Sequence, residues 1–489
     1  MSYAGLAMLA LVVPFAGTAL IVAAGRYPNL RETATFGTSI TLFFIVVSLV
    51  PAVLAGGRPR ILLFEMLPGI ALMLEVEPLG LIFAAIASTL WVVSTAYSIG
   101  YMRANGEGNQ TRFYACFAGA IGAAVGIAFS GNLLTMFLFY EMLTFVTYPL
   151  VTHHGTEEAR RAGRMYLGYL IGTSTLFLLP AVIWTWLAAG SLDFRAGGLL
   201  AGRLDAGSAA ILLALFMFGI GKAALMPFHR WLPAAMVAPA PVSALLHAVA
   251  VVKAGVFCVV KVLVYVLGVD TLARLGSAEW LVYVAGFTIL SASVVALRAD
   301  NLKRRLAYST VSQLSYVVLA AALLTPLSIV GAAFHIAAHA VSKITLFFAA
   351  GAIYTAAHKT EVSQMAGIGR SMPITMTAFA IGALSLIGVP PAVGFMSKWM
   401  ILQGAVESGR HVALGVILLS TLLNAAYFLP IIYTAFFRAP AAGDAHAAHG
   451  EAPWPMVLAL SATALLTIAL FFFSGPLLEL SRQLAGAAP

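Results

Sequence analysis

Charge is what this sequence has least of. Asp, Glu, Lys and Arg together make up 9% of its 489 residues, whereas soluble domains contain about 25%. Hydrophobic residues make up 61%, and the mean hydropathy is +0.97. The shortage of charge excludes an ordinary soluble domain and predicts an all-α polytopic membrane protein.

Cysteine is also scarce, and both copies, Cys116 and Cys258, lie inside apolar runs. That placement excludes a disulfide framework and a cysteine metal site. Because the sequence has no flavin, iron–sulfur or dinucleotide motif, we expect no cofactor and no redox chemistry in this chain. The basic segment of a cleaved signal peptide is missing as well, which predicts that the first apolar run is a retained span.

The net charge of +9 does not call for a nucleic-acid partner, because the basic residues occupy short loops between apolar runs. Odd-numbered loops hold fifteen Lys and Arg residues and even-numbered loops hold six. By the positive-inside rule, the odd loops should be cytoplasmic. Both termini would then lie on the outer face of a bacterial-type cytoplasmic membrane.

Apolar length is what the chain has in abundance. Runs of about 20 residues cross a bilayer as helices, and we expect about 14 of them. No soluble domain interrupts the runs, and the stretch Arg438–Trp454, with His446 and His449, is expected to be a solvated loop. The runs lie near 4–24, 33–55, 71–101, 113–129, 132–151, 165–188, 208–228, 239–267, 279–297, 306–325, 328–356, 373–404, 411–437 and 454–475.

The segment 221–253 combines charge with helix breakers. It holds Lys222, His247 and Lys253 together with four prolines. Ionisable groups are unfavourable at bilayer depth, so they are functional by default. Proline frees backbone groups, which is tolerated where protein or a wet cavity takes them up. The combination predicts a broken helix on an ion path.

Glu141 lies near the middle of the fifth run. A carboxylate at that depth is neutral or paired with a cation from another helix, and Lys222 is the natural partner. A lysine beside a movable negative charge gains or loses its proton on demand, which is what a proton relay needs. A purely structural ion pair is the alternative.

Lys253 and His247 stand six residues apart, on different sides of one helix and about 9 Å apart along its axis. We expect them to be successive stations for a proton. Lys261 lies on the same face as Lys253 and nearer the membrane surface. It either extends this row or snorkels to the interface without a further role.

His335, His339 and Lys343 follow one another at i, i+4 and i+8 along one face of the eleventh run. The glutamate of an HExxH motif and a third ligand are missing, so we expect no metal there. Stepwise proton transfer suits the ladder better. Polar residues of the tenth run line the same wet path or serve as packing contacts between helices: Tyr308, Ser309, Thr310, Ser312, Gln313, Ser315 and Tyr316.

Lys398 follows a second helix break, made by Pro390, Pro391 and Gly394. The two broken helices, the seventh and the twelfth, are five spans apart and would face opposite ways. This is the sign of an inverted-topology repeat with sites at the midplane. We therefore expect a three-helix segment at 1–112, two inverted five-helix repeats at 113–267 and 268–438, and a C-terminal loop and last helix at 439–489.

The run GKAALMPFHRWLPAAMVAPAPVSALLHAVAVVKAGVF, residues 221–257, resembles the signature of the antiporter-like subunits of respiratory complex I. Large subunits of Mrp-type sodium/proton antiporters and subunits of membrane-bound hydrogenases belong to the same family. FYEMLTFVTYPLV around Glu141, HAVSK ending in Lys343 and PPAVGFMSK ending in Lys398 support the match, which covers nearly all of the chain.

The resemblance implies that Glu141 and Lys222 form the acid–base pair of a first half-channel. It implies Lys253 with His247 as the central connection, and Lys343 with Lys398 as the second half-channel. Some family members carry glutamate at the position of Lys398. Because the chain ends soon after its last run, a shorter Mrp-type, D-like subunit is the expected subtype.

Ion translocation is the function that these residues predict. The chain would be a proton-translocating subunit that works with other integral membrane subunits, with or without exchange of H⁺ for Na⁺. The alternative is a scaffold or coupling subunit of a complex I-like or hydrogenase-like assembly, whose buried charges only hold helices together. An organic-solute transporter fits less well, because the buried polar groups form a line instead of one cluster.

Overall fold

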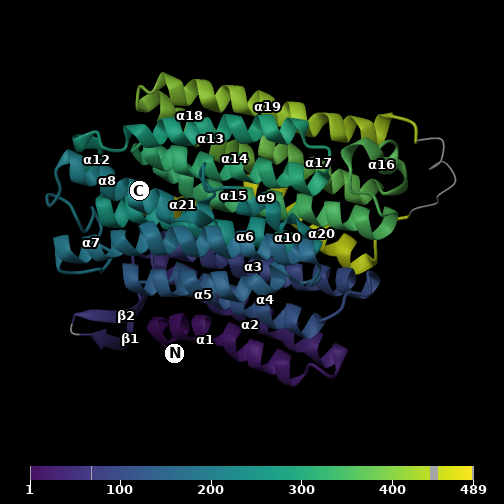
Figure 1. The fold of residues 1–489 in the computed structure, drawn as a ribbon, viewed down its shortest axis with the longest axis horizontal. Helices are drawn as coiled ribbons and strands as arrows, with labels where there is room; N and C mark the ends of the chain where they lie inside the picture. The colour runs from purple at the N-terminus through teal and green to yellow at the C-terminus, as the bar shows by residue number, and fades with distance from the viewer. Residues whose placement is uncertain (1, 68, 441–449, 487–489) are drawn as a thin grey trace.

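The computed structural model describes residues 2–67, 69–440 and 450–486, so His446 and His449 lie outside the described residues. Long helices lie side by side and run across the view in Figure 1, from the β1–β2 and α12 end to the α16 end. The helices up to the centre of the chain are α1 (Tyr3–Ala23), α2 (Pro28–Leu54), α3 (Pro78–Ala104), α4 (Gln110–Ala128), α5 (Leu133–Val151), α6 (Glu157–Thr173), α7 (Leu179–Ala189), α8 (Ala206–Gly219), α9 (Trp231–Ala234), α10 (Ala240–Ala244) and α11 (Val251–Lys261).

The rest of the chain is helical in the same way. Its helices are α12 (Val269–Leu275), α13 (Glu279–Arg298), α14 (Leu302–Ala322), α15 (Pro326–Ala357), α16 (Ile368–Ser371), α17 (Pro373–Ile387), α18 (Val393–Glu407), α19 (His411–Phe437), α20 (Trp454–Phe472) and α21 (Gly475–Leu484). Three π-helical segments are η1 (Ser174–Leu178), η4 (Leu245–Val249) and η5 (Val262–Leu267), and three 3-10 turns are η2 (Gly221–Ala223), η3 (Ala235–Val237) and η6 (Val362–Gln364).

A polytopic membrane protein is confirmed by the length and polarity of these helices. Eleven helical stretches within the described residues are long and apolar enough to cross a membrane, and two apolar helices, α8 and α17, are shorter. The outer surface carries large exposed apolar side chains such as Leu187 and Phe473, each 77% exposed. A hydrocarbon solvent accepts such a surface, whereas water would drive its aggregation.

One part of the chain departs from the all-helical expectation. Residues predicted to open the third span form the second strand of an antiparallel hairpin, β1 (Arg60–Leu67) with β2 (Ile70–Glu75). Helix α3 begins only at Pro78, because the Glu77 carboxylate accepts hydrogen bonds from the amides of Leu79 and Gly80, both at 2.8 Å. Since Pro at the first helical position and an acidic N-cap both favour a helix start, the span begins after the hairpin.

The chain is broken at both predicted places. Helix α8 ends before Ile220, and η2 and irregular backbone follow; Ala224, at the end of η2, has φ +54°. Helix α17 ends before Gly388, whose φ of +95° suits glycine alone among common residues, and α18 resumes at Val393. Each break lies beside a lysine, Lys222 in the first and Lys398 one turn into α18.

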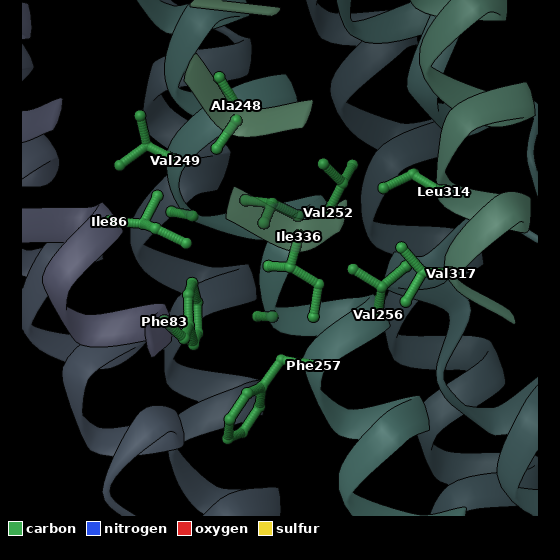
Figure 2. Packing of buried hydrophobic residues seen from close by; sticks show 14 of the residues in the cluster. Phe83, Ile86, Ala248, Val249, Val252, Val256, Phe257, Leu314, Val317 and Ile336 are labelled. Atoms are coloured by element: carbon green, nitrogen blue, oxygen red, sulfur yellow. The ribbon is translucent and has the colours of Figure 1, made fainter. Parts of the chain in front are cut away.

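Two helical stretches form the centre of the molecule. Helix α15 is buried along all of its most apolar window, and the stretch Ala240–Leu267 is buried over 94% of its own. Figure 2 shows apolar side chains of these stretches and their neighbours, among them Phe257 of α11 and Phe83 of α3, whose ring centroids are 5.2 Å apart. The space between these helices is therefore largely filled by hydrocarbon side chains.

Close backbone approach holds the broken helices in place. A Cβ on Gly255 of α11 would lie 2.3 Å from the carbonyl carbon of Lys222, and a Cβ on Gly394 would lie 1.9 Å from the carbonyl oxygen of Ser385. Both distances are far below contact, so only glycine lets α11 pass the first break and α18 pass α17.

Candidate functional site

Lys222 lies at the first helix break and is fully buried. Its Nζ donates hydrogen bonds to the Tyr140 carbonyl at 2.8 Å and to the Thr144 hydroxyl at 2.6 Å. The ammonium group also lies 3.2 Å from the centre of the Tyr140 ring. All of these contacts come from α5, because the break turns the lysine toward that helix.

Glu141 is the next residue of α5 after Tyr140, and it is half-buried. Its Oε1 is buried and has no hydrogen-bond partner in the described part of the chain. No ion pair between described residues joins Glu141 to Lys222, although the two side chains belong to neighbouring elements. Their coupling remains a prediction, and an unpartnered carboxylate oxygen is free to accept a proton or a hydrogen bond.

Lys253 and His339 connect the centre of the molecule. Lys253 of α11 is 1% exposed, and its Nζ contacts Nδ1 of His339 on α15. Nε2 of His339 is buried without a partner among the residues that the structure describes. The imidazole therefore has one nitrogen on the lysine and one nitrogen open to a further proton partner.

The ladder continues along α15 toward Lys398. The rings of His335 and His339 are stacked with centroids 6.0 Å apart. Nδ1 of His335 lies 2.9 Å from the hydroxyl of Ser397, the residue before Lys398. Nζ of Lys398 donates to the Ile387 carbonyl at 3.2 Å, at the end of α17. The structure thus brings His339, His335 and Lys398 together around the second break.

Lys343 points to a different helix. Its Nζ donates to the Leu306 carbonyl at 3.0 Å and to the Ser309 hydroxyl at 2.9 Å, both on α14. Ser309 in turn accepts from the Tyr427 hydroxyl at 3.0 Å. Lys343 therefore leaves the histidine ladder and joins a polar cluster between α14 and α19.

His247 is the most isolated of the predicted residues. It lies in the π-helical segment η4, is fully buried, and packs its ring on Phe347 with centroids 4.6 Å apart. Neither ring nitrogen has a partner within the described residues. Two buried unpaired nitrogens are unusual, and π-helical turns are frequent at functional positions.

The polar residues of the tenth run divide between the two expected roles. Ser309 contacts Lys343, and the Tyr316 ring lies 5.0 Å from Nζ of Lys398. Ser312 instead bonds the Ser293 hydroxyl of α13 at 3.0 Å, which is a packing contact between helices. Only one face of α14 meets the lysines.

The prediction that Lys261 snorkels to the membrane surface is wrong, and the hydrogen bonds of its Nζ go to Glu77 and Ser130 instead of to the other predicted site residues. The side chain is 0% exposed and its Nζ forms an ion pair with Glu77 Oε1 at 3.3 Å. It also donates to the Ser130 carbonyl at 2.8 Å, while Tyr265 donates to the other Glu77 oxygen at 2.9 Å. We predict no role for Glu77 from the sequence, although an acid inside an apolar run is a signal of the same kind as Glu141.

These features define a polytopic membrane protein with a row of ionisable side chains at its centre. We call Lys222, His247, Lys253, His335, His339, Lys343 and Lys398 the buried row. A family model described as NADH:quinone oxidoreductase/Mrp antiporter, TM, matches residues 130–424, a span that includes Glu141 and the whole buried row. The chain therefore belongs to this family.

Comparison with individual relatives supports this family membership. The chain is 33% identical over 374 residues to NADH-quinone oxidoreductase subunit N of Desulforudis audaxviator (strain MP104C), which covers 75% of this chain and 73% of that one. It is 31% identical over 465 residues to a probable K(+)/H(+) antiporter subunit of Rhizobium meliloti (strain 1021), covering 91% of this chain but only 45% of that longer protein. A chain of the Mrp complex from Dietzia sp. DQ12-45-1b has the same fold, with a TM-score of 0.87 at 22% identity over 99% of this chain and 97% of that one.

Proposed function

We propose that this chain is a proton-translocating, antiporter-like subunit of a multisubunit complex in a bacterial-type cytoplasmic membrane. The observation that carries the proposal is the contact of Lys253 with His339. These two bases come from α11 and α15, and no acid stands between them. Two adjacent protonated bases repel each other, so the pair is expected to share one proton.

A finer architecture goes with this function. We take the chain to cross the membrane fourteen times, counting each broken helix as one crossing, with inverted repeats at 113–267 and 268–438 between the segments 1–112 and 439–489. In support, Lys222 lies over Tyr140 and Lys398 lies over Tyr316, with ring distances of 3.2 and 5.0 Å. Each half thus places the lysine of its broken helix against a tyrosine of its α5 or α14 helix. Both termini would face the outside.

Proton movement follows from the bases that lack a fixed partner. A proton on Lys253 passes to His339, which breaks one N–H bond and forms another. Nε2 of His339 then gives the proton up to a bridging water, which passes a proton to Nε2 of the stacked His335 ring. The Nδ1 proton of His335 moves to the Ser397 hydroxyl, next to Lys398. The apolar packing of Figure 2 keeps bulk water away from the sides of this route. Glu141 and Lys222 would deliver protons to the buried row in the first repeat, and Lys343 would carry protons in the second repeat.

Family membership also supports a proposal about the partner subunits and the transported ion. Other integral membrane subunits would cover the exposed apolar surface in part, and lipid would cover the rest. The lysines and histidines of the buried row can bind and release H⁺, so H⁺ is the ion that we expect the chain to transport. Measuring sodium flux alongside proton flux shows whether H⁺ is exchanged for Na⁺. The alternative, a scaffold with structural charges, predicts that the lysines matter for assembly alone.

The deciding experiment compares Lys253→Ala with Lys261→Ala in membrane vesicles that contain the whole complex. Proton and sodium fluxes are measured with a pH-sensitive dye and ²²Na⁺, and each is divided by the amount of assembled complex. Lys253→Ala should lower the flux per complex at least tenfold, and Lys261→Ala should leave it unchanged. A normal flux in Lys253→Ala would favour the scaffold, and equal losses in both variants would indicate general electrostatics.

A further inference from the structure

A polar cavity lies at the end of the molecule where the odd-numbered loops gather. It has a volume of ≈ 230 Å³ and is lined by the carboxylate of Glu107, the imidazole of His154 and the ammonium group of Lys303. Glu107 comes from the loop between α3 and α4, His154 from the loop after α5, and Lys303 from the first turn of α14. Three segments distant in sequence therefore bring an acid, a base and a cation to one cavity.

Glu107 contacts two histidines, and Lys303 lies in the same cavity. Glu107 Oε1 lies 3.3 Å from Nε2 of His154, and its Oε2 lies 3.7 Å from Nε2 of His153. Nζ of Lys303 donates to the carbonyl of Ala238 at 2.6 Å, directly before α10. The side chain of His154 is 38% exposed, whereas that of Glu107 is 13% exposed. The cluster thus reaches from water into the protein.

Three more ionisable groups line the cavity. Tyr101, Tyr354 and Lys359 complete its ionisable lining. The hydrogen bond with Glu107 raises the pKa of the His154 imidazole above its ordinary value of 6.5, although burial and the charge of Lys303 act to lower it.

The inner end of the cavity points along two helices to the buried row. Ala240 of α10 and Gly351 of α15 line the cavity. His247 follows Ala240 by seven residues, roughly 10 Å along a helix, and Phe347 precedes Gly351 by about one turn. The rings of His247 and Phe347 are in contact at 4.6 Å. The first base beyond the cavity on α10 and η4 is therefore His247, whose two ring nitrogens lack partners among the described residues.

We propose that this cavity is the proton-uptake vestibule of the chain, with the Glu107–His154 pair as its acceptor site and His247 as the first base of the buried row that it supplies. The inference rests on the proposed function. Protonated His154 gives its proton to water in the cavity, and a chain of waters carries it the roughly 10 Å along α10 to His247. Neutral His154 takes the next proton from bulk water. Lys303 anchors the chain just before α10 through the Ala238 carbonyl.

The test uses the assembled complex in membrane vesicles and measures proton flux per complex as a function of pH. Glu107→Gln should lower the flux about fivefold or more and move its pH optimum to lower pH, because the histidine then binds its proton more weakly. The matched control is Glu157→Gln, which removes an exposed carboxylate that pairs with Arg164 and does not line the cavity. It should keep both the flux and the optimum.

A second variant tests the proposal if Glu107→Gln assembles poorly. Met236→Cys places a thiol on the cavity wall, and the flux is compared before and after reaction with a cationic methanethiosulfonate. Reaction should block the flux, and the same reagent on Glu157→Cys should not.

A normal flux and optimum in Glu107→Gln, an unblocked Met236→Cys, or an equal loss in the Glu157 variants would each overturn the vestibule. Lys253→Ala is measured alongside: if it blocks the flux while the cavity variants do not, the vestibule fails and the proposed function stands. If Lys253→Ala conducts normally, the proposed function itself fails.

Discussion

The Lys261–Glu77 ion pair gives a sharp prediction about stability. Both side chains are buried, at 0% and 7% exposure, and the two charges are 3.3 Å apart. Removing one partner of a buried pair leaves an uncompensated charge and typically costs about 3–5 kcal/mol. Lys261→Ala should therefore lower the free energy of unfolding by about this amount. The loss should be near the upper end because the Ser130 carbonyl also loses its donor.

A nearby exposed pair supplies the control. Arg60 and Asp193 form an ion pair at 2.8 Å with 51% and 44% exposure. Exposed pairs contribute about 0–1 kcal/mol, so Arg60→Ala should be close to neutral. Stability is measured by denaturant titration of the purified protein in detergent. The double variant Lys261→Met with Glu77→Gln should lose less than the sum of the two single variants, because neither charge is then left alone.

The result that would refute this reasoning is a Lys261→Ala variant no less stable than Arg60→Ala. It would mean that water or lipid headgroups already screen the pair. Flux per assembled complex is a separate readout and should not change in Lys261→Ala, since the ion pair holds α3 to α11 and lies outside the buried row.

The other predictions concern the two breaks and the loops. Lys398→Arg should keep fold and assembly but stop turnover nearly as completely as Lys398→Ala, because arginine cannot release its proton; full flux in the arginine variant would remove Lys398 from the relay. Glu141→Gln and Lys222→Ala should each abolish flux without loss of assembly, and normal flux in either would disprove their coupling. The hydrogen bond between Glu107 and His154 raises the pKa of His154 above 6.5. Burial acts to raise the pKa of Glu107, but His154, His153 and Lys303 outweigh it, so that the pKa of Glu107 falls below 4.5. The pair therefore stabilises the fold between these limits and is lost as pH rises through the pKa of His154 or falls through that of Glu107; Glu107→Gln should lower the melting temperature at pH 6 and have little effect at pH 9.

Hydropathy predicted much of this molecule because it is a local property. A run of about 20 apolar residues crosses a bilayer as a helix whatever its neighbours are. Proline and glycine act within one turn, so the breaks beside Lys222 and Lys398 were also readable from the sequence. The hairpin at 60–75 was missed for the reverse reason, since its apolar second strand runs on into the third span.

The partners of the charged side chains were decided by the tertiary structure. Lys253 meets His339 across 86 positions of the sequence, and Lys261 meets Glu77 across 184. Helical spacing places a side chain on a face of its own helix, but only packing decides which helix that face meets. Lys343 shows the difference, because it shares a predicted face with His335 and His339 yet bonds to Ser309 on α14.

The sequence by itself therefore determined the class of protein, the positions of the helix breaks and which residues carry ionisable groups into the membrane. Only the tertiary structure decided which of those groups touch. The physical reason is the low dielectric of the interior, where Coulomb interactions are strong and weakly screened, so the distances between charges, which packing alone sets, decide their energies. Gly255 is the clearest example of a contact that only the tertiary structure shows. Because it has no side chain, α11 lies against the backbone of Lys222, and no local sequence pattern predicts that contact.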